Sequence, residues 1–135
     1  MILQWLPAVV DDGANVEGCS QILFAAHIAG RAFATGTGLG LAHGIANPLS
    51  ARTRVVHGEA PAVSLPHVMT FSLVACTDVY GRLAVSLGLR KHMARPSDSA
   101  GGVIAAIQEL SNRLGLDERL SPLGANPAMV PWIAW

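Results

Sequence analysis

Two histidines, His43 and His57, lie fourteen residues apart, and each of them is next to a glycine. Neutral imidazole nitrogens are among the commonest protein ligands for transition metals. A gap of this length allows one helix to supply the first imidazole and the start of the next helix to supply the second. The spacing alone leaves open the alternative that both are ordinary core or surface histidines.

The residues around this pair form a longer pattern. It begins with Gly-Leu-Gly-Leu-Ala-His at 38–43, passes through a segment of small residues, and continues with His-Gly at 57–58 and Leu-Pro-His-Val at 65–68. This order and spacing resemble the metal-binding block of the iron-dependent alcohol dehydrogenases. The resemblance extends outward to residues 25–30 and 78–89, so it covers most of the chain.

The resemblance implies a fold, a metal and a cofactor. The fold would be all-α, a helical bundle like the C-terminal domain of the dehydroquinate synthase-like and iron-dependent alcohol dehydrogenase fold. Residues 1–135 would form a single helical domain that is truncated at both ends relative to the family. His43 and His57 would be two of four protein ligands to Fe(II) or Zn(II).

The same resemblance implies that two metal ligands and the cofactor-binding domain lie outside the 135 residues. In the family, the other two metal ligands are an Asp and a His one helical turn apart, and they belong upstream. The domain that binds NAD(P) also belongs upstream. We therefore expect an incomplete metal site, and NAD(P) binding only where a partner domain is present.

Three positions depart from the family pattern. Asn47 stands four residues after His43, on the same helical face, where the family usually has a histidine in the substrate pocket. Asn47 is the candidate catalytic-pocket residue, although an amide cannot carry a proton as imidazole can. Val56 replaces a common proline, and Glu59 replaces an aliphatic residue. Glu59 could orient His57, but stabilisation of a helix N-terminus is the favoured interpretation.

The other histidines have structural interpretations. His27 lies in an apolar helical segment and His67 in Leu-Pro-His-Val, and we predict that both are buried. His92 is predicted to be solvated in a polar loop. The glycines at 36–40 do not form a nucleotide-binding Gly-x-Gly-x-x-Gly, because Leu41 stands at the third glycine position and no strand is predicted before them. No cofactor-binding residue is assigned.

Helical periodicity predicts the elements that must position these residues, and no segment alternates long enough for a strand. We predict helices over about 1–10, 16–34, 39–51, 57–71, 78–87 and 99–114. Pro66 should bend the fourth helix, Thr77 should cap the fifth, and Ser99 or Asp98 should cap the sixth. Beyond Asp117, three prolines allow only short helical turns.

Composition limits the class of function. Of the 135 residues, 51% are apolar and 13% are charged, and the formal net charge is zero. The charge balance argues against nucleic-acid binding, while the apolar content indicates that some surface lies against another domain or subunit. Cys19 and Cys76 lack Cys-x-x-Cys spacing and indicate free thiols in a reducing cytoplasm. We expect no membrane span, since the longest uncharged run, 32–51, contains a histidine, an asparagine and four glycines.

Two hypotheses from different classes follow. In the first, the chain is a fragment or separated helical metal-binding domain of an NAD(P)-dependent oxidoreductase of small alcohols and aldehydes, and it is inactive alone. In the second, it is a non-enzymatic helical module that docks on a separately encoded nucleotide-binding half. A further arrangement would complete the metal site in a homo-oligomer, between copies of the chain.

Overall fold

The computed structural model describes residues 1–36, 38–89, 96–116 and 119–133, and every regular element within them is helical. The α-helices are α1 (Ile2–Asp11), α2 (Val16–Thr35), α3 (Leu41–Arg52), α4 (Glu59–Ser86), α5 (Ala100–Arg113) and α6 (Val130–Ile133), and the 3-10 helices are η1 (Pro96–Ser99) and η2 (Pro127–Met129). The predicted all-α fold is confirmed, and the described part of the C-terminal region contains only short turns, as its prolines require.

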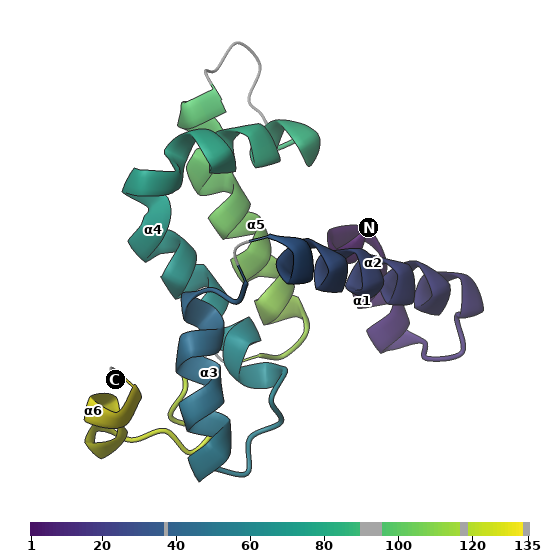
Figure 1. Cartoon of the computed structure of the whole chain (residues 1–135). Helices are drawn as coiled ribbons and strands as arrows, with labels where there is room; N and C mark the ends of the chain where they lie inside the picture. Colours follow the sequence, from purple (N-terminus) through teal and green to yellow (C-terminus); the bar gives the residue numbers. More distant parts are fainter. Residues whose placement is uncertain (37, 90–95, 117–118, 134–135) are drawn as a thin grey trace.

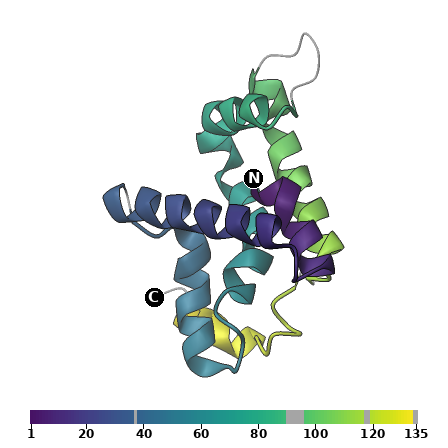
Figure 2. The ribbon, with the colours of Figure 1, turned by 90° about the vertical axis from the view of Figure 1, so that its right-hand side faces the viewer.

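The helices form two groups that meet near the middle of the molecule. Helices α4 and α5 run side by side, and α1 and α2 form a second pair that extends away from them (Figures 1 and 2). Helix α3 leads away from the end of α2 and packs against α4, while α6 lies beside α3. The connection from α3 to α4 carries His57, so the packing of these two helices sets the position of that side chain.

Helix α4 corrects the sequence prediction of two helices over 57–71 and 78–87. It is one continuous helix from Glu59 to Ser86. The hydroxyl of Thr77 does not cap a new helix, because it donates to the carbonyl of Leu73 at 2.6 Å, one turn back in the same helix. Pro66 lies inside α4, and Figure 1 shows that the helix axis changes direction along its length. Proline and hydroxyl groups that bond to the preceding turn both bend helices.

Two apolar clusters hold the helices together. The first lies between α4 and α5 and consists of Met69, Ala84, Val103 and Ile104. The second joins α3, the first turn of α4 and the C-terminal segment, and it consists of Ala46, Leu49 and Ala60 with Val55, Leu120, Ala125 and Met129 partly buried around them. Leu49 and Val103 are the largest side chains that are fully buried.

Glycines end the two long helices of the first cluster. Gly88, with φ of +70°, follows α4, and Gly115, with φ of +71°, follows α5. At the first, the amide of Leu89 donates to the carbonyl of Ala84 at 2.9 Å, which is the long bond of a Schellman motif. The helix ends predicted near residues 87 and 114 are confirmed. Ser99, one of the two predicted cap residues, stands at the N-cap position of α5, but its hydroxyl makes no capping bond and is buried with no hydrogen-bond partner among the described residues.

Helix α4 is also long and apolar enough, by length and composition alone, to cross a membrane. The core helices of water-soluble proteins meet the same criteria, and α4 packs along both α3 and α5. Its buried residues include Val63, Met69 and Ala84. Only 22% of the apolar window of α4 is buried within the described chain, and Phe71 and Val74 on this helix are exposed.

The crossing of α1 and α2 depends on a glycine, and this yields a first test. A Cβ atom added at Gly18 would lie 2.7 Å from Cγ2 of Val9 and 3.2 Å from the side chain of Asn15, which caps α2. Val9 is β-branched and Asn15 is held by its capping bond, so we expect Gly18→Ala to lower the free energy of unfolding by about 1–3 kcal/mol. The measurement is urea unfolding followed by circular dichroism.

The matched control is Gly102→Ala. Gly102 lies in α5 and has no atom within 4 Å of an added Cβ. Alanine is the better helix former, so this variant should be as stable as the parent or gain up to about 1 kcal/mol. Equal effects of the two substitutions would contradict the close α1–α2 crossing.

Candidate metal centre

The structure brings His43 and His57 together. His43 lies in the first turn of α3 and is half-buried, and His57 lies exposed in the connection just before α4. Their ring centroids are 5.7 Å apart and the ring planes are inclined by 47°. Two side chains fourteen residues apart in the sequence thus lie close together at the α3–α4 corner.

The distance between the ring centroids lies within the range for two imidazoles that share one cation. A metal–nitrogen distance near 2.0–2.1 Å places the centroids of two rings on one ion about 5–6 Å apart. Two imidazoles alone do not complete a site, because structural zinc takes four protein ligands and catalytic zinc usually three. Among the residues that the structure describes, no three His, Cys, Asp or Glu side chains lie close enough to hold an ion.

Ser50 is a neighbour that the sequence analysis missed. Its Oγ lies 3.4 Å from Nδ1 of His57, and the donor of this contact depends on the tautomer of the imidazole. Contacts of this kind orient a metal-binding ring and leave Nε2 available. The signal was present in the sequence, since Ser50 stands seven residues after His43, two turns along the same face of a helix.

Asn47 precedes the connection between α3 and α4, and Glu59 follows it. Asn47 is exposed on α3, one turn beyond His43 and one turn before Ser50. Glu59 is the first residue of α4, where a carboxylate stabilises the helix dipole. The contact at Nδ1 of His57 that the structure records is made by Ser50.

The burial predicted for two other histidines is wrong. His27 on α2 and His67 on α4 are both exposed. The apolar residues around each of them suggested a core, but these helices leave much of their apolar surface uncovered: Leu23 and Phe24 are also exposed. His92 lies outside the described residues.

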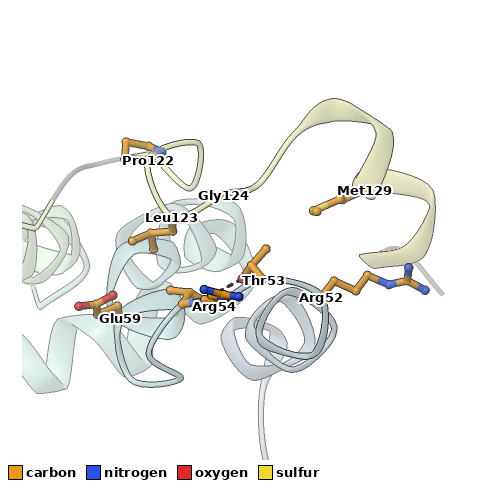
Figure 3. Close-up of a pocket in the computed structure, with 9 residues that line it drawn as sticks. Arg52, Thr53, Arg54, Glu59, Pro122, Leu123, Gly124 and Met129 are labelled. Atoms are coloured by element: carbon orange, nitrogen blue, oxygen red, sulfur yellow. Dashed lines mark hydrogen bonds between the residues drawn. The ribbon is translucent and has the colours of Figure 1, made fainter.

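A pocket of about 530 Å³ lies beside the same α3–α4 connection, on the side that faces the C-terminal segment. Figure 3 shows Pro122, Leu123 and Met129 on one wall and Arg52 and Arg54 on the other. The guanidinium carbon of Arg52 lies 4.4 Å from the centroid of the Trp132 ring. Neither His43 nor His57 lines this pocket, so it is distinct from the candidate metal centre.

The whole chain matches one family of known proteins. Residues 1–135 match the model of the Fe-containing alcohol dehydrogenase family, C-terminal. The chain belongs to this family. Because the matched model is the C-terminal part of the family, His43 and His57 lie in the C-terminal, helical portion of the Fe-containing alcohol dehydrogenases.

Individual relatives agree with this assignment. The chain is 32% identical over 134 residues to the 1,3-propanediol dehydrogenase of Klebsiella pneumoniae and 28% identical over 134 residues to the NAD-dependent methanol dehydrogenase of Bacillus methanolicus. Each match covers 99% of this chain and 34% or 35% of the relative. The chain therefore spans about a third of the length of the relatives it matches.

A solved structure confirms the helical fold. The chain superposes on the crystal structure of a 1,3-propanediol oxidoreductase with a TM-score of 0.90 at 32% identity. This similarity covers 98% of the chain and 35% of that structure. The helices described above are thus arranged as in the corresponding third of that relative.

Proposed function

We propose that these 135 residues form the helical, metal-binding portion of an NAD(P)-dependent alcohol or aldehyde oxidoreductase. The observation that carries the proposal is the 5.7 Å separation of the His43 and His57 rings in a chain that matches the family over its whole length. The two imidazoles would be two of the protein ligands to Fe(II) or Zn(II). The remaining ligands and the nicotinamide site would come from polypeptide that, in the family, precedes the matched third.

The chemistry of such a site is that of a Lewis acid beside a hydride carrier. A divalent metal bound there would polarise the oxygen of an alcohol or carbonyl while hydride passes to or from the nicotinamide. His43 and His57 would hold the metal, and Ser50 would orient His57 through Nδ1. Asn47 would bind a substrate oxygen through its amide and would not relay a proton.

The substrate class proposed is a small alcohol or aldehyde. Two relatives are named for methanol and for 1,3-propanediol, both of which are short and polar. The cytoplasm is the proposed compartment, because the described cysteines, Cys19 and Cys76, are free thiols with no disulfide between them.

The proposal predicts that activity requires the preceding polypeptide. The test protein is a chimera in which residues 1–135 replace the matched portion of the Klebsiella pneumoniae 1,3-propanediol dehydrogenase. We expect the purified 135-residue chain to give no NAD(P)-dependent alcohol oxidation, because two imidazoles do not complete a catalytic site. The chimera, loaded with Fe(II) under argon, should bind metal and reduce NAD⁺ when supplied with 1,3-propanediol.

Three results would contradict the proposal. Turnover by the 135-residue chain alone would show that its metal site is complete. A chimera that folds, as judged by circular dichroism, but binds no metal would remove the role of His43 and His57. A metal site that appears only in oligomers of the 135-residue chain would indicate that two or more copies of the chain supply its ligands together.

An alternative function is that of a non-enzymatic helical module that docks on a nucleotide-binding partner. The large exposed apolar side chains on α2 and α4 favour it. This alternative predicts that His43→Ala leaves the stability of the chimera unchanged. It also predicts that the helical module associates with its nucleotide-binding partner without metal. The first proposal predicts metal binding that depends on His43.

A further inference from the structure

The pocket between the α3–α4 connection and the C-terminal segment has the size of a small-molecule site. Its volume of about 530 Å³ lies within the range of about 300–1,000 Å³ that is usual for such sites. One wall carries the cationic side chains Arg52 and Arg54, and the other carries the apolar side chains Pro122, Leu123 and Met129 (Figure 3). A ligand that matches both walls has an anionic group and an apolar body.

The two arginines have N–H donors to offer to an anion. The contact of Arg52 with the Trp132 ring restrains the arginine side chain, but the ring supplies no acceptor oxygen for its N–H groups. Arg54 is exposed, and no carboxylate among the described residues forms an ion pair with either arginine. Guanidinium groups bind planar carboxylates through two parallel hydrogen bonds. Both arginines can therefore donate to a carboxylate that enters the pocket.

Glu59 also lines the pocket and limits the charge of the ligand. Two arginines and one glutamate give the lining two positive charges and one negative charge, which leaves one positive charge in excess. A half-buried carboxylate such as that of Glu59 repels a ligand with several negative charges. The lining thus favours a monocarboxylate over a phosphate ester, which carries about two negative charges near pH 7.

The apolar wall determines what the rest of the ligand must be. Leu123 and Met129 are half-buried, so each retains surface that a ligand can cover. This wall also lies close to the α3–α4 connection, because a Cβ atom added at Gly124 would lie 3.4 Å from Cγ2 of Thr53. Burial of apolar surface contributes about 25 cal/mol per Å², so a short alkyl chain or an aromatic ring adds to the affinity of the carboxylate.

We propose that this pocket binds a small monocarboxylate with an alkyl or aryl body. The carboxylate would accept hydrogen bonds from the two arginines, and the body would pack against the apolar wall. The inference does not depend on the proposed function, because neither His43 nor His57 lines the pocket. It gives the chain a second small-molecule site, distinct from the candidate metal centre.

Titration with sodium hexanoate tests the proposal, and hexanamide is the uncharged isostere. Binding is followed by heteronuclear NMR in the 135-residue chain, or in the chimera if circular dichroism shows that the chain alone is unfolded. Arg54→Gln removes one guanidinium group. Arg82→Gln is the matched control, because Arg82 is an exposed arginine on α4 that does not line the pocket. Leu123→Ala tests the apolar wall.

The expected result is specific to the pocket. Hexanoate should shift the side-chain resonances of Arg52, Arg54 and Trp132, and Arg54→Gln should raise the Kd of hexanoate by about fivefold or more. Hexanamide should bind at least about fivefold more weakly than hexanoate. Arg82→Gln should change the Kd by less than about twofold. Leu123→Ala should weaken hexanoate binding by about two- to threefold and leave the binding of acetate, which lacks the alkyl chain, unchanged.

Three outcomes would overturn the proposal. Addition of hexanoate without any change in these resonances would show that the pocket binds no carboxylate. Equal losses of affinity from Arg54→Gln and Arg82→Gln would show that hexanoate associates with surface charge in general. Inorganic phosphate that binds as tightly as hexanoate would show a general anion site in which the apolar wall has no part. A chimera that binds metal but not hexanoate would refute this inference and leave the proposed function intact.

Discussion

Replacement of His43 by alanine is expected to lower the affinity of the chimera for Zn²⁺ by about 100-fold or more. The rings of His43 and His57 lie 5.7 Å apart, so loss of either imidazole removes one of the nitrogens proposed to hold the ion. Each ligand contributes a large share of the binding free energy, and no other His, Cys, Asp or Glu cluster in the described residues could replace it. The measurement is competition with a chromophoric chelator.

His27→Ala is the matched control for this prediction. His27 is an exposed helical histidine on α2 and lies outside the α3–α4 corner. Its removal should leave the affinity for Zn²⁺ unchanged, whereas Ser50→Ala should cause a smaller loss, about tenfold, by releasing the ring of His57. An equal loss from His27→Ala and His43→Ala would mean that the ion binds to surface imidazoles in general.

Replacement of Leu49 by alanine is expected to lower the free energy of unfolding by about 2–5 kcal/mol. Leu49 is fully buried and belongs to the cluster that joins α3, the first turn of α4 and the C-terminal segment. The substitution removes buried methyl groups and leaves a cavity that the flanking Ala46 and Ala60 are too small to fill. Urea unfolding of the 135-residue chain, followed by circular dichroism, gives the value.

Leu23→Ala is the control for Leu49→Ala. Leu23 lies in α2 and is 72% exposed, so its truncation should change the stability by less than about 0.5 kcal/mol. The Leu49 cluster also supports the α3–α4 connection, and Leu49→Ala in the chimera should therefore weaken metal binding as well. If Leu49→Ala lowered the stability by less than Leu23→Ala does, the Leu49 cluster would not be what holds the α3–α4 connection in place.

Most helix positions were predictable because local signals agree with one another. Apolar periodicity predicted the end of α1 and the end of α5 to within a residue or two. The division of α4 into two helices was wrong because Thr77 has the same hydroxyl in a cap and in a helix interior. The bond from the Thr77 hydroxyl to the carbonyl of Leu73, which forms in the folded chain, shows that Thr77 lies in a helix interior.

Burial was the least predictable property. The apolar surroundings of His27 and His67 suggested a core, yet both side chains are exposed because no element of the described chain covers those faces. An apolar helical face looks the same in the sequence whether it packs within the chain or against another polypeptide.

Residue types and their order are sufficient to name the family and to select His43 and His57. The motif around the two histidines, and the ability of imidazole to bind a metal, depend only on which residues are present and in what order. The 5.7 Å approach of the two rings and the contact of Ser50 with His57 depend on how α3 packs against α4. That packing comes from the burial of the Leu49 cluster, whose members on α3 and α4 contact side chains of the C-terminal segment. Contacts between residues so distant in the sequence are a property of the folded chain, and no local pattern encodes them.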